Sequence, residues 1–207
     1  MAENATCFFK SAMSFLLISN WTRAFAGSFF FHPTKLYMTH SMIYTSSIPV
    51  FTQILGGLSA VLTKAEAHAS DKKIDPNALL QAQLSPDMFP LLRQVQVASD
   101  FAKSVSARLA GVEVPKTPDT ENTFAELQAR ITAVLAFVKS LNPADFEQAA
   151  SREIITQAGT PKEKRFTGQS YLLHYGLPHF FFHTTTAYAI LRHNGVEIGK
   201  KDFIGSY

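Results

Sequence analysis

The stretch PLLRQVQVASDFAKSVSARLAG, residues 90–111, decides the fold class. Its apolar residues recur at alternating steps of four and three positions, the spacing that keeps side chains on one face of an α-helix. They are Leu91, Val95, Ala98, Ala102, Val105 and Leu109. Gly111 follows, and glycine is common just after the last residue of a helix. The stretch therefore predicts an amphipathic helix that ends at about Ala110.

Three further segments show helical apolar patterns: 46–69, 120–141 and a last segment that begins near Thr167 and ends before Gly195. Each is long enough to bury one face against the others. Four amphipathic helices predict an all-α protein built as a four-helix bundle, with a crossover connection before the last helix.

Glycines in the first of these segments and acidic residues at the start of 120–141 lead to further local predictions. Gly56 and Gly57 lie in the middle of the first segment, where each glycine costs about 1 kcal/mol relative to alanine, so we expect a close packing contact or a bend there. Asp119 and Glu121 lie at the start of 120–141, where the helix dipole favours negative charge.

The apolar residues of 120–141 also step by three and four positions. They are Phe124, Leu127, Ile131, Val134, Val138 and Leu141. We therefore expect Ile131→Ala to leave a cavity and cost about 2–5 kcal/mol of stability. Arg130→Ala, one position round the helix, is expected to cost under about 1 kcal/mol, as exposed substitutions usually do.

Between the third and fourth segments lies REIITQAGTPKEKRFTG, residues 152–168. Its EIIT and KRFT arms flank Gly-Thr-Pro, a set of turn residues. Two short β-prone arms around such a turn predict a β-hairpin. The fold is thus expected to be a four-helix bundle with a small β-hairpin before the last helix.

The first 37 residues differ in composition from the rest, since they hold 7 of the 18 Phe and the only Trp and Cys. Residues 1–37 are predicted to be an N-terminal extension outside the fold, and 38–207 to be one domain. The extension has two interpretations: a signal-like segment with a short apolar core, or sequence upstream of a natural start at Met38. We favour the second.

Composition and charge exclude several classes of function. The net charge of +3 is thinly spread, with no basic stripe, so no nucleic-acid partner is expected. The N-terminal apolar run is too short to span a bilayer, so no membrane partner is expected. Residues 38–207 contain no cysteine, which excludes disulfides, thiolate metal sites and a cysteine nucleophile there. This fits a cytoplasmic protein.

The last segment holds the candidate site residues His174, His179 and His183. His179 and His183 are four positions apart, so they project from one face of a helix and could bind one metal ion. The same pair is also explained by histidines that a helical core carries with a hydrogen-bonding partner. A bend at Gly176–Pro178 is expected to decide whether His174 joins them, because proline disrupts the preceding helical turn.

A catalytic zinc site typically needs a third protein ligand. Gln94 lies at the edge of the buried face of the 90–110 helix, close enough to the apolar stripe to contribute. Asp100 is the better ligand chemically, but Asp100 and Gln96 are predicted on the opposite face, in solvent. An amide oxygen is a poor zinc ligand, so the third position is where the metal hypothesis is weakest.

Several strings resemble the bacterial and fungal family called domain of unknown function 1993. They are MTHSMIYTSSIPVF, AEAHA, PDMFPLLRQVQVASDFAK, ARLAGVEVP, TFAELQARI and FHTTTAYAILRHNGVEIGKKDF. That family is regarded as related to the DinB/YfiT-like four-helix superfamily. The resemblance covers essentially all of 38–207. It implies an up-down-down-up bundle, often dimeric, in which many members bind a divalent metal through three histidines.

Carried over by position, the superfamily's last-helix histidine pair falls on His179 and His183. Its second-helix histidine falls on Gln94, so the resemblance gives only part of the metal set. His174 is a candidate compensating ligand. The resemblance therefore implies the fold more firmly than it implies the metal.

Two classes of function remain. The first is a metal-free helical bundle that binds a small molecule or serves as a dimeric module, in which Gln94, His174 and His183 form a buried polar network; a homodimer is expected. The alternative is an enzyme that uses a divalent metal, zinc or nickel, held by His179 and His183, for thiol transfer or hydrolysis. A hydrolase built on a catalytic dyad or triad is not expected, because no G-x-S-x-G string is present and no carboxylate is evidently placed to orient a histidine.

Overall fold

The structure is a computed structural model that describes residues 41–206. The predicted extension at residues 1–37 lies outside the described residues. The helices are α1 (Met42–Thr45), α2 (Ile48–Lys72), α3 (Pro76–Leu80), α4 (Leu91–Ala110), α5 (Phe124–Ser140), α6 (Gly168–Tyr171), α7 (Leu177–His193) and α8 (Lys200–Ile204). The other elements are a 3-10 turn η1 (Pro143–Phe146), strands β1 (Glu153–Thr156) and β2 (Lys164–Thr167), and a π-helical turn η2 (Leu172–Gly176).

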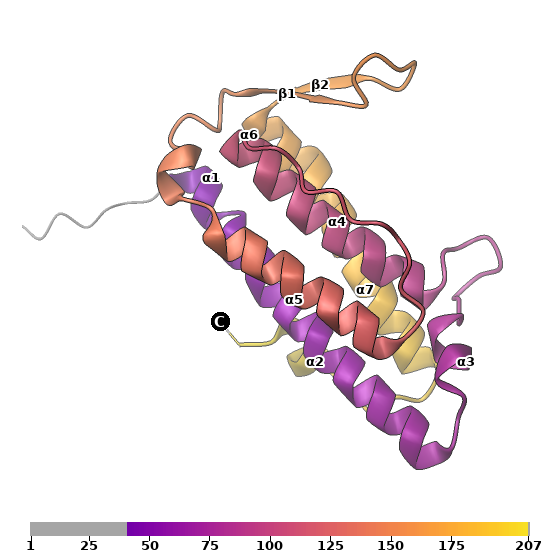
Figure 1. The fold of residues 1–207 in the computed structure, drawn as a ribbon. Coiled ribbons are helices and arrows are strands. Elements are labelled where there is room, and N and C mark those ends of the chain that lie inside the picture. Colours follow the sequence, from indigo (N-terminus) through magenta and orange to yellow (C-terminus); the bar gives the residue numbers. More distant parts are fainter. Residues whose placement is uncertain (1–40, 207) are drawn as a thin grey trace, which may run out of the picture. The chain divides into compact units, whose positions relative to one another are not determined.

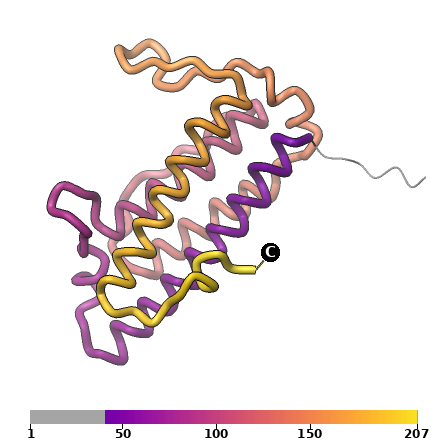
Figure 2. The backbone as a smooth tube through the Cα atoms, turned by 180° about the vertical axis from the view of Figure 1, so that it is seen from behind, coloured from indigo at the N-terminus to yellow at the C-terminus, as the bar shows by residue number. Residues whose placement is uncertain are grey.

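The four long helices form a closed ring around one core. Helix α2 packs against α5, α5 against α4, α4 against α7, and α7 against α2. Figures 1 and 2 show this arrangement from opposite sides. The apolar stripes predicted from the sequence point inward, and Leu91, Val95, Leu127 and Ile131 are all fully buried. The predicted all-α four-helix bundle is confirmed.

The order of directions along the chain is down, up, up, down. Helices α4 and α5 run in the same direction, opposite to α2 and α7 (Figure 1). The connection 111–123 therefore returns along the length of the bundle from the end of α4 to the start of α5. The crossover was expected before the last helix and lies instead between α4 and α5, because α5 ends at the same end of the bundle where α6 begins.

Local signals explain how α4 and α5 are bounded. Helix α4 ends with Gly111 at a φ of 75°, a left-handed conformation that glycine adopts without steric cost. Helix α5 begins after Thr123, whose hydroxyl accepts from the Glu126 backbone while the Glu126 carboxylate accepts from the Thr123 backbone. This capping box fixes the helix start. Asp119 and Glu121 therefore precede the helix and do not serve its dipole.

The last helix is interrupted where the sequence predicted a bend. Helix α6 runs into the π-helical turn η2, and Pro178 occupies the first turn of α7, where proline is tolerated. A β-carbon at Gly176 would lie 2.9 Å from a methyl of Val105, so the absence of a side chain lets this turn approach α4 closely. The bend takes the form of a wider turn followed by a restarted helix.

The β-hairpin is confirmed at the predicted arms. Strands β1 and β2 pair antiparallel, with Ile154 opposite Phe166 and Thr156 opposite Lys164. The hairpin lies at the end of the bundle where α6 begins (Figure 1). It therefore places β2 next to the start of the last helix.

The short helices α1, α3 and α8 were not predicted from the sequence, and α8 explains a glycine in α2. Helix α8 packs on α2, and the C-terminal segment lies alongside α2 in Figure 2. A β-carbon at Gly57 would lie 2.5 Å from the carbonyl oxygen of Phe203 in α8. The close packing contact expected at Gly56–Gly57 is thus present at Gly57.

The helical segment Met42–Lys72 is long and apolar enough to cross a membrane by length and composition alone. Half of its apolar window is buried inside the protein. Its buried positions include Phe51, Leu55 and Leu62, which face the other bundle helices. A core helix of a bundle passes the same test, so this segment is weak support for membrane insertion.

Candidate functional site

The predicted site residues meet where α4 packs against α7. Gln94 lies in the first turn of α4 and is 1% exposed, and His183 lies in the middle of α7 and is 7% exposed. Nδ1 of His183 lies 2.7 Å from Oε1 of Gln94. A buried imidazole and a buried amide, each costly to leave unpaired, therefore satisfy one another.

The other half of the Gln94 amide determines which atom donates. Nε2 of Gln94 donates to the backbone carbonyl of Phe89 at 3.0 Å, so Oε1 is the atom that faces His183. An amide oxygen only accepts, and therefore Nδ1 of His183 must carry the proton. In the neutral ring this leaves an unprotonated Nε2 with a free lone pair.

Nε2 of His183 has no hydrogen-bond partner among the described residues. It is also absent from the set of completely buried, unpaired side-chain atoms of residues 41–206, which are Thr52 Oγ1, Ser106 Oγ and Arg130 Nε. The atom therefore keeps some contact with solvent. An open hydrogen-bond acceptor lies at the edge of an otherwise buried ring.

Both histidines of the pair are disfavoured in their charged form. Burial lowers the pKa of His183 to about 4, with smaller contributions from His179 and Arg93. Burial also lowers the pKa of His179, and the positive charge of Lys164 adds to that effect. At neutral pH His183 is therefore an uncharged acceptor at Nε2, and a weak base.

Aromatic rings surround the two histidines. Phe101 of α4 stacks on His179 with ring centroids 4.7 Å apart and an interplanar angle of 5°, and its centroid lies 6.0 Å from that of His183. Tyr175 packs on the His179 ring at 4.6 Å, and Phe182 meets His183 edge-on at 5.2 Å. We call the group Gln94, Phe101, Tyr175, His179, Phe182 and His183 the histidine–aromatic site.

The structure brings three of the four predicted residues together. Gln94 and His183 bond directly, and His179 joins them through the shared stack on Phe101. His174 is exposed in the π-helical turn, with Nδ1 3.4 Å from the Ser170 hydroxyl. It therefore makes no contact with the polar network to which the sequence had assigned it.

The side chains present do not fit a three-histidine metal centre. Only His179 and His183 supply ring nitrogens at the site, and the amide oxygen of Gln94 already accepts from His183. Within residues 41–206 no group of three His, Cys, Asp or Glu side chains is arranged to hold a metal ion. A catalytic zinc ion requires about three protein ligands. The site therefore lacks a third ligand for a catalytic zinc ion.

A second buried polar group was not foreseen. The Arg130 side chain is 1% exposed and reaches three carboxylates: Asp100 at 2.8 Å, Asp119 at 2.9 Å and Glu121 at 2.9 Å. Lys103, Gln96 and Arg93 extend the network from α4, by bonding Thr117, Glu121 and Asp119 respectively. We call these residues the Arg130 cluster.

The Arg130 cluster corrects two expectations. Gln96 and Asp100 were predicted to face solvent, yet Gln96 is 2% exposed and Asp100 pairs with buried Arg130. Asp119 and Glu121 hold the returning connection 111–123 against α4 and α5. Burial alone would raise the pKa of Glu121, but the hydrogen bonds from Arg130, Gln96 and the backbone, together with the charge of Arg130, outweigh burial and lower that pKa.

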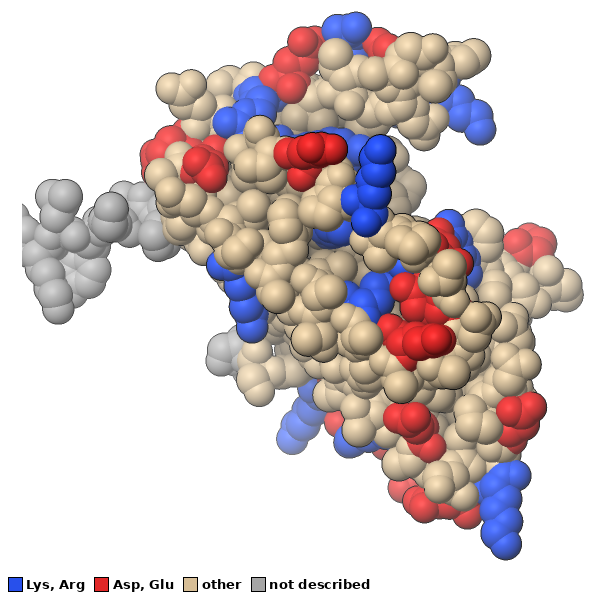
Figure 3. All heavy atoms as spheres, viewed as in Figure 1, with Lys and Arg blue, Asp and Glu red and all other residues tan. Residues whose placement is uncertain are grey.

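Charge spacing on α4 could have revealed this cluster. Gln96, Asp100 and Lys103 are separated by four and three positions, so they form a polar stripe on one helix face. On the face shown in Figure 3, acidic and basic side chains lie side by side over the connection between α4 and α5. The Arg130 cluster therefore has a structural role: it holds the long connection 111–123 against the bundle.

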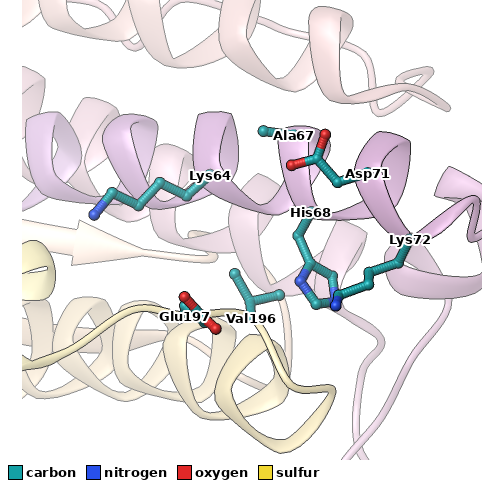
Figure 4. Close-up of a pocket in the computed structure, with 7 residues that line it drawn as sticks. All are labelled: Lys64, Ala67, His68, Asp71, Lys72, Val196 and Glu197. Atoms are coloured by element: carbon teal, nitrogen blue, oxygen red, sulfur yellow. The ribbon is translucent and has the colours of Figure 1, made fainter.

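A separate hollow of about 390 Å³ lies between the second half of α2 and the segment after α7. In Figure 4 the His68 side chain points from α2 toward Val196. The lining residues are Lys64, Ala67, His68, Asp71, Lys72, Val196 and Glu197. Lys64 is already paired with Asp202 at 2.7 Å, and the mixed charges of the rim favour no single ligand.

Comparison with known proteins identifies the family. The family model described as domain of unknown function (DUF1993) matches residues 43–204. The chain belongs to the DUF1993 family. No curated protein matches the chain.

This DUF1993 chain is also similar to a solved structure, the crystal structure of a DinB family member protein from Shewanella denitrificans. The two are 44% identical, the match covers 80% of this chain and 93% of that one, and the TM-score is 0.76. The resemblance stated from the sequence, to the DUF1993 family and to DinB-like bundles, is confirmed.

Proposed function

We propose that this DUF1993 protein is a metal-free binding protein whose His183–Gln94 pair anchors a small molecule. The observation that carries the proposal is the 2.7 Å contact between Nδ1 of His183 and Oε1 of Gln94. It holds the ring in one orientation and leaves Nε2 as an acceptor. A ligand that carries a hydroxyl or amide N–H would donate to this atom.

The surroundings of Nε2 support a binding role over base catalysis. A histidine whose pKa is lowered to about 4 is a weak proton acceptor at neutral pH, whereas a good general base has a pKa near the working pH. Ligand sites are commonly apolar surfaces with a few placed polar groups. Phe101 and Phe182 supply such a surface beside His183, and Tyr175 extends it at His179.

The metal-dependent alternative lacks a ligand. His183 is oriented as a metal-bound histidine would be, with one ring nitrogen held by an oxygen and the other free. His179 could add a second nitrogen, but Gln94 stands where the superfamily has its third histidine. The proposal therefore gives Gln94 the role of orienting His183.

We also propose that the protein is a cytoplasmic homodimer. The expectation comes from the family resemblance, and an exposed apolar side chain on the last helix supports it: Phe182 is 56% exposed. The absence of cysteine from residues 38–207 is compatible with the reducing cytoplasm. Light scattering coupled to size-exclusion chromatography should give twice the chain mass, and a monomer at micromolar concentration would contradict the dimer.

Nitrogen NMR of the histidine side chains tests the proposed function. At pH 7 the His183 ring should be neutral, with Nδ1 protonated and Nε2 unprotonated. A compound that donates a hydrogen bond to the site should move the Nε2 resonance more than the Nδ1 resonance. A charged ring, or a proton on Nε2 in place of Nδ1, would contradict the assigned pairing.

A further inference from the structure

Strand β2 presents one positive charge to the histidine–aromatic site. Side chains alternate along a strand, so Lys164 and Phe166 share one face and Arg165 takes the other. Nζ of Lys164 lies 5.8 Å from the ring centroid of Tyr175, and the Phe166 ring lies 5.3 Å from it. The hairpin thus contributes Lys164 to the surface on which Tyr175 and His179 lie.

On the opposite face of β2 the positive charge is balanced by carboxylates. Arg165 pairs with Glu163 at 2.9 Å and with Glu153 at 3.2 Å. Lys164, by contrast, forms an ion pair with no carboxylate of residues 41–206. The two adjacent basic residues therefore differ in whether their charge is already balanced.

The surface between Lys164 and His183 is aromatic and uncharged at neutral pH. Tyr175 and His179 are in contact at 4.6 Å, and His179 reaches the His183 neighbourhood through Phe101. His179 is exposed and Tyr175 is half-buried, so this surface is open to a ligand. An unbalanced cation thus lies at one end and a neutral acceptor at the other.

We propose that the site takes a carboxylate that carries a planar aromatic ring, with the ring against Tyr175 and His179 and the acid group on Lys164. A hydroxyl at the far end of such a molecule would donate to Nε2 of His183. Charge complementarity carries the assignment, because Lys164 has no carboxylate partner among residues 41–206, and the exposed His179 ring and half-buried Tyr175 ring offer aromatic contact area beside it. The inference deepens the proposed function and rests on it.

Three related compounds separate the two ends of the site. They are 3-(4-hydroxyphenyl)propionate, its neutral amide, and 3-phenylpropionate, which lacks the hydroxyl. Affinities are measured by NMR titration of the full chain, following the Tyr175 and His179 ring signals. The acid should bind about fivefold more tightly than the amide, the upper range for one partly exposed ion pair.

Two variants on adjacent positions provide a matched comparison. Each of the two variants removes one positive charge from β2, but only Lys164 faces the rings. Lys164→Gln should therefore abolish the preference for acid over amide, and Arg165→Gln should keep it. Both positions are exposed, so both variants are expected to fold. The hydroxyl compound should exceed its deoxy partner in affinity in the wild-type protein and should shift Nε2 of His183.

Each contrary result has its own meaning. The aromatic-acid inference would be overturned by any of three results: equal affinity for acid and amide, a preference for the acid that survives Lys164→Gln, or a preference that Arg165→Gln removes as fully as Lys164→Gln does. In each of those cases a retained hydroxyl preference would still support the His183 anchor. If none of the three compounds showed saturable binding, the inference would also be overturned. The NMR measurement of the His183 tautomer would then test the proposed function separately.

Discussion

The side-chain oxygen of Gln94 lies 2.7 Å from Nδ1 of His183, across the contact between α4 and α7. This bond joins two helices that are far apart in sequence and determines the state of the candidate site. It sets the ring orientation and the tautomer, and it leaves Nε2 as the free acceptor. Gln94 is for this reason a positioning residue.

Loss of the Gln94 side-chain amide should destabilise the protein, because His183 then lacks its hydrogen-bond partner. Gln94→Leu leaves the buried Nδ1–H of His183 unpaired, and we expect a loss of about 1–3 kcal/mol in the free energy of unfolding, measured by urea denaturation. Gln148→Ala, on the exposed surface, is the control and should change stability by under about 0.5 kcal/mol.

The double variant Gln94→Leu with His183→Leu should recover part of that loss, because replacing both partners of a buried bond with apolar groups removes the unpaired donor. Strict additivity of the two single changes would show that the pair is not coupled.

Acid should destabilise the protein partly through His183. Its pKa is about 4 in the folded state and near 6.5 in the unfolded chain, so between these values the unfolded state binds the extra proton. Its contribution is therefore complete above pH 6.5 and is lost as pH falls toward 4, by roughly 3 kcal/mol for a shift of this size.

His179, whose pKa is also lowered, acts in the same direction. Urea denaturation at several pH values should show a weaker pH dependence between pH 6.5 and 4 in His183→Gln than in the wild-type protein. Identical slopes for the two proteins would mean that His183 titrates normally when folded.

The sequence predicted four of the bundle's properties from local signals. Apolar spacing located the four long helices, Gly111 ended α4, the turn residues located the hairpin, and Gln94 was placed near the buried face. These features depend on neighbours within one element, and one sequence contains that information. The predicted bend before α7 also followed from Gly176 and Pro178, although its π-helical form did not.

What the sequence missed depends on contacts between distant segments. Arg130 was expected on the surface, but the returning connection 111–123 covers it and brings Asp119 and Glu121 to it. Local periodicity contains no information on where a long connection runs. His174 was assigned to the polar network and faces outward because the π-helical turn sets its direction.

Arg130→Ala should therefore be among the most damaging single changes, contrary to the sequence-based expectation. Removing the buried guanidinium leaves Glu121 without a cation, while Asp100 keeps only Lys103 and Asp119 keeps only Arg93, at a cost of about 3 kcal/mol or more. Lys139→Ala on the exposed side of α5 is the matched control and should cost under about 0.5 kcal/mol.

Chemical denaturation of Arg130→Ala, Lys139→Ala and Ile131→Ala gives the loss in unfolding free energy for each variant, and so ranks the three changes. If Arg130→Ala were as mild as Lys139→Ala, the ion pairs of the cluster would contribute nothing measurable.

Adjacent glycines in α2 should respond oppositely to alanine. A β-carbon at Gly57 would lie 2.5 Å from the backbone oxygen of Phe203, so Gly57→Ala must displace α8 and should cost about 1–3 kcal/mol. At Gly56 nothing lies within 4 Å, so Gly56→Ala should raise stability by up to about 1 kcal/mol. Thermal melts of the two variants check both signs, and a stabilising Gly57→Ala would contradict the packing of α8 on α2.

The metal content of protein purified without a histidine tag tests the central claim most directly. We predict far less than one zinc or nickel ion per chain by mass spectrometry, and no change in melting temperature on adding EDTA, because Gln94 orients His183 and supplies no third ligand. Near-stoichiometric metal that is lost in His183→Ala, with a lower melting temperature under EDTA, would contradict this account, since a bound ion stabilises the folded state.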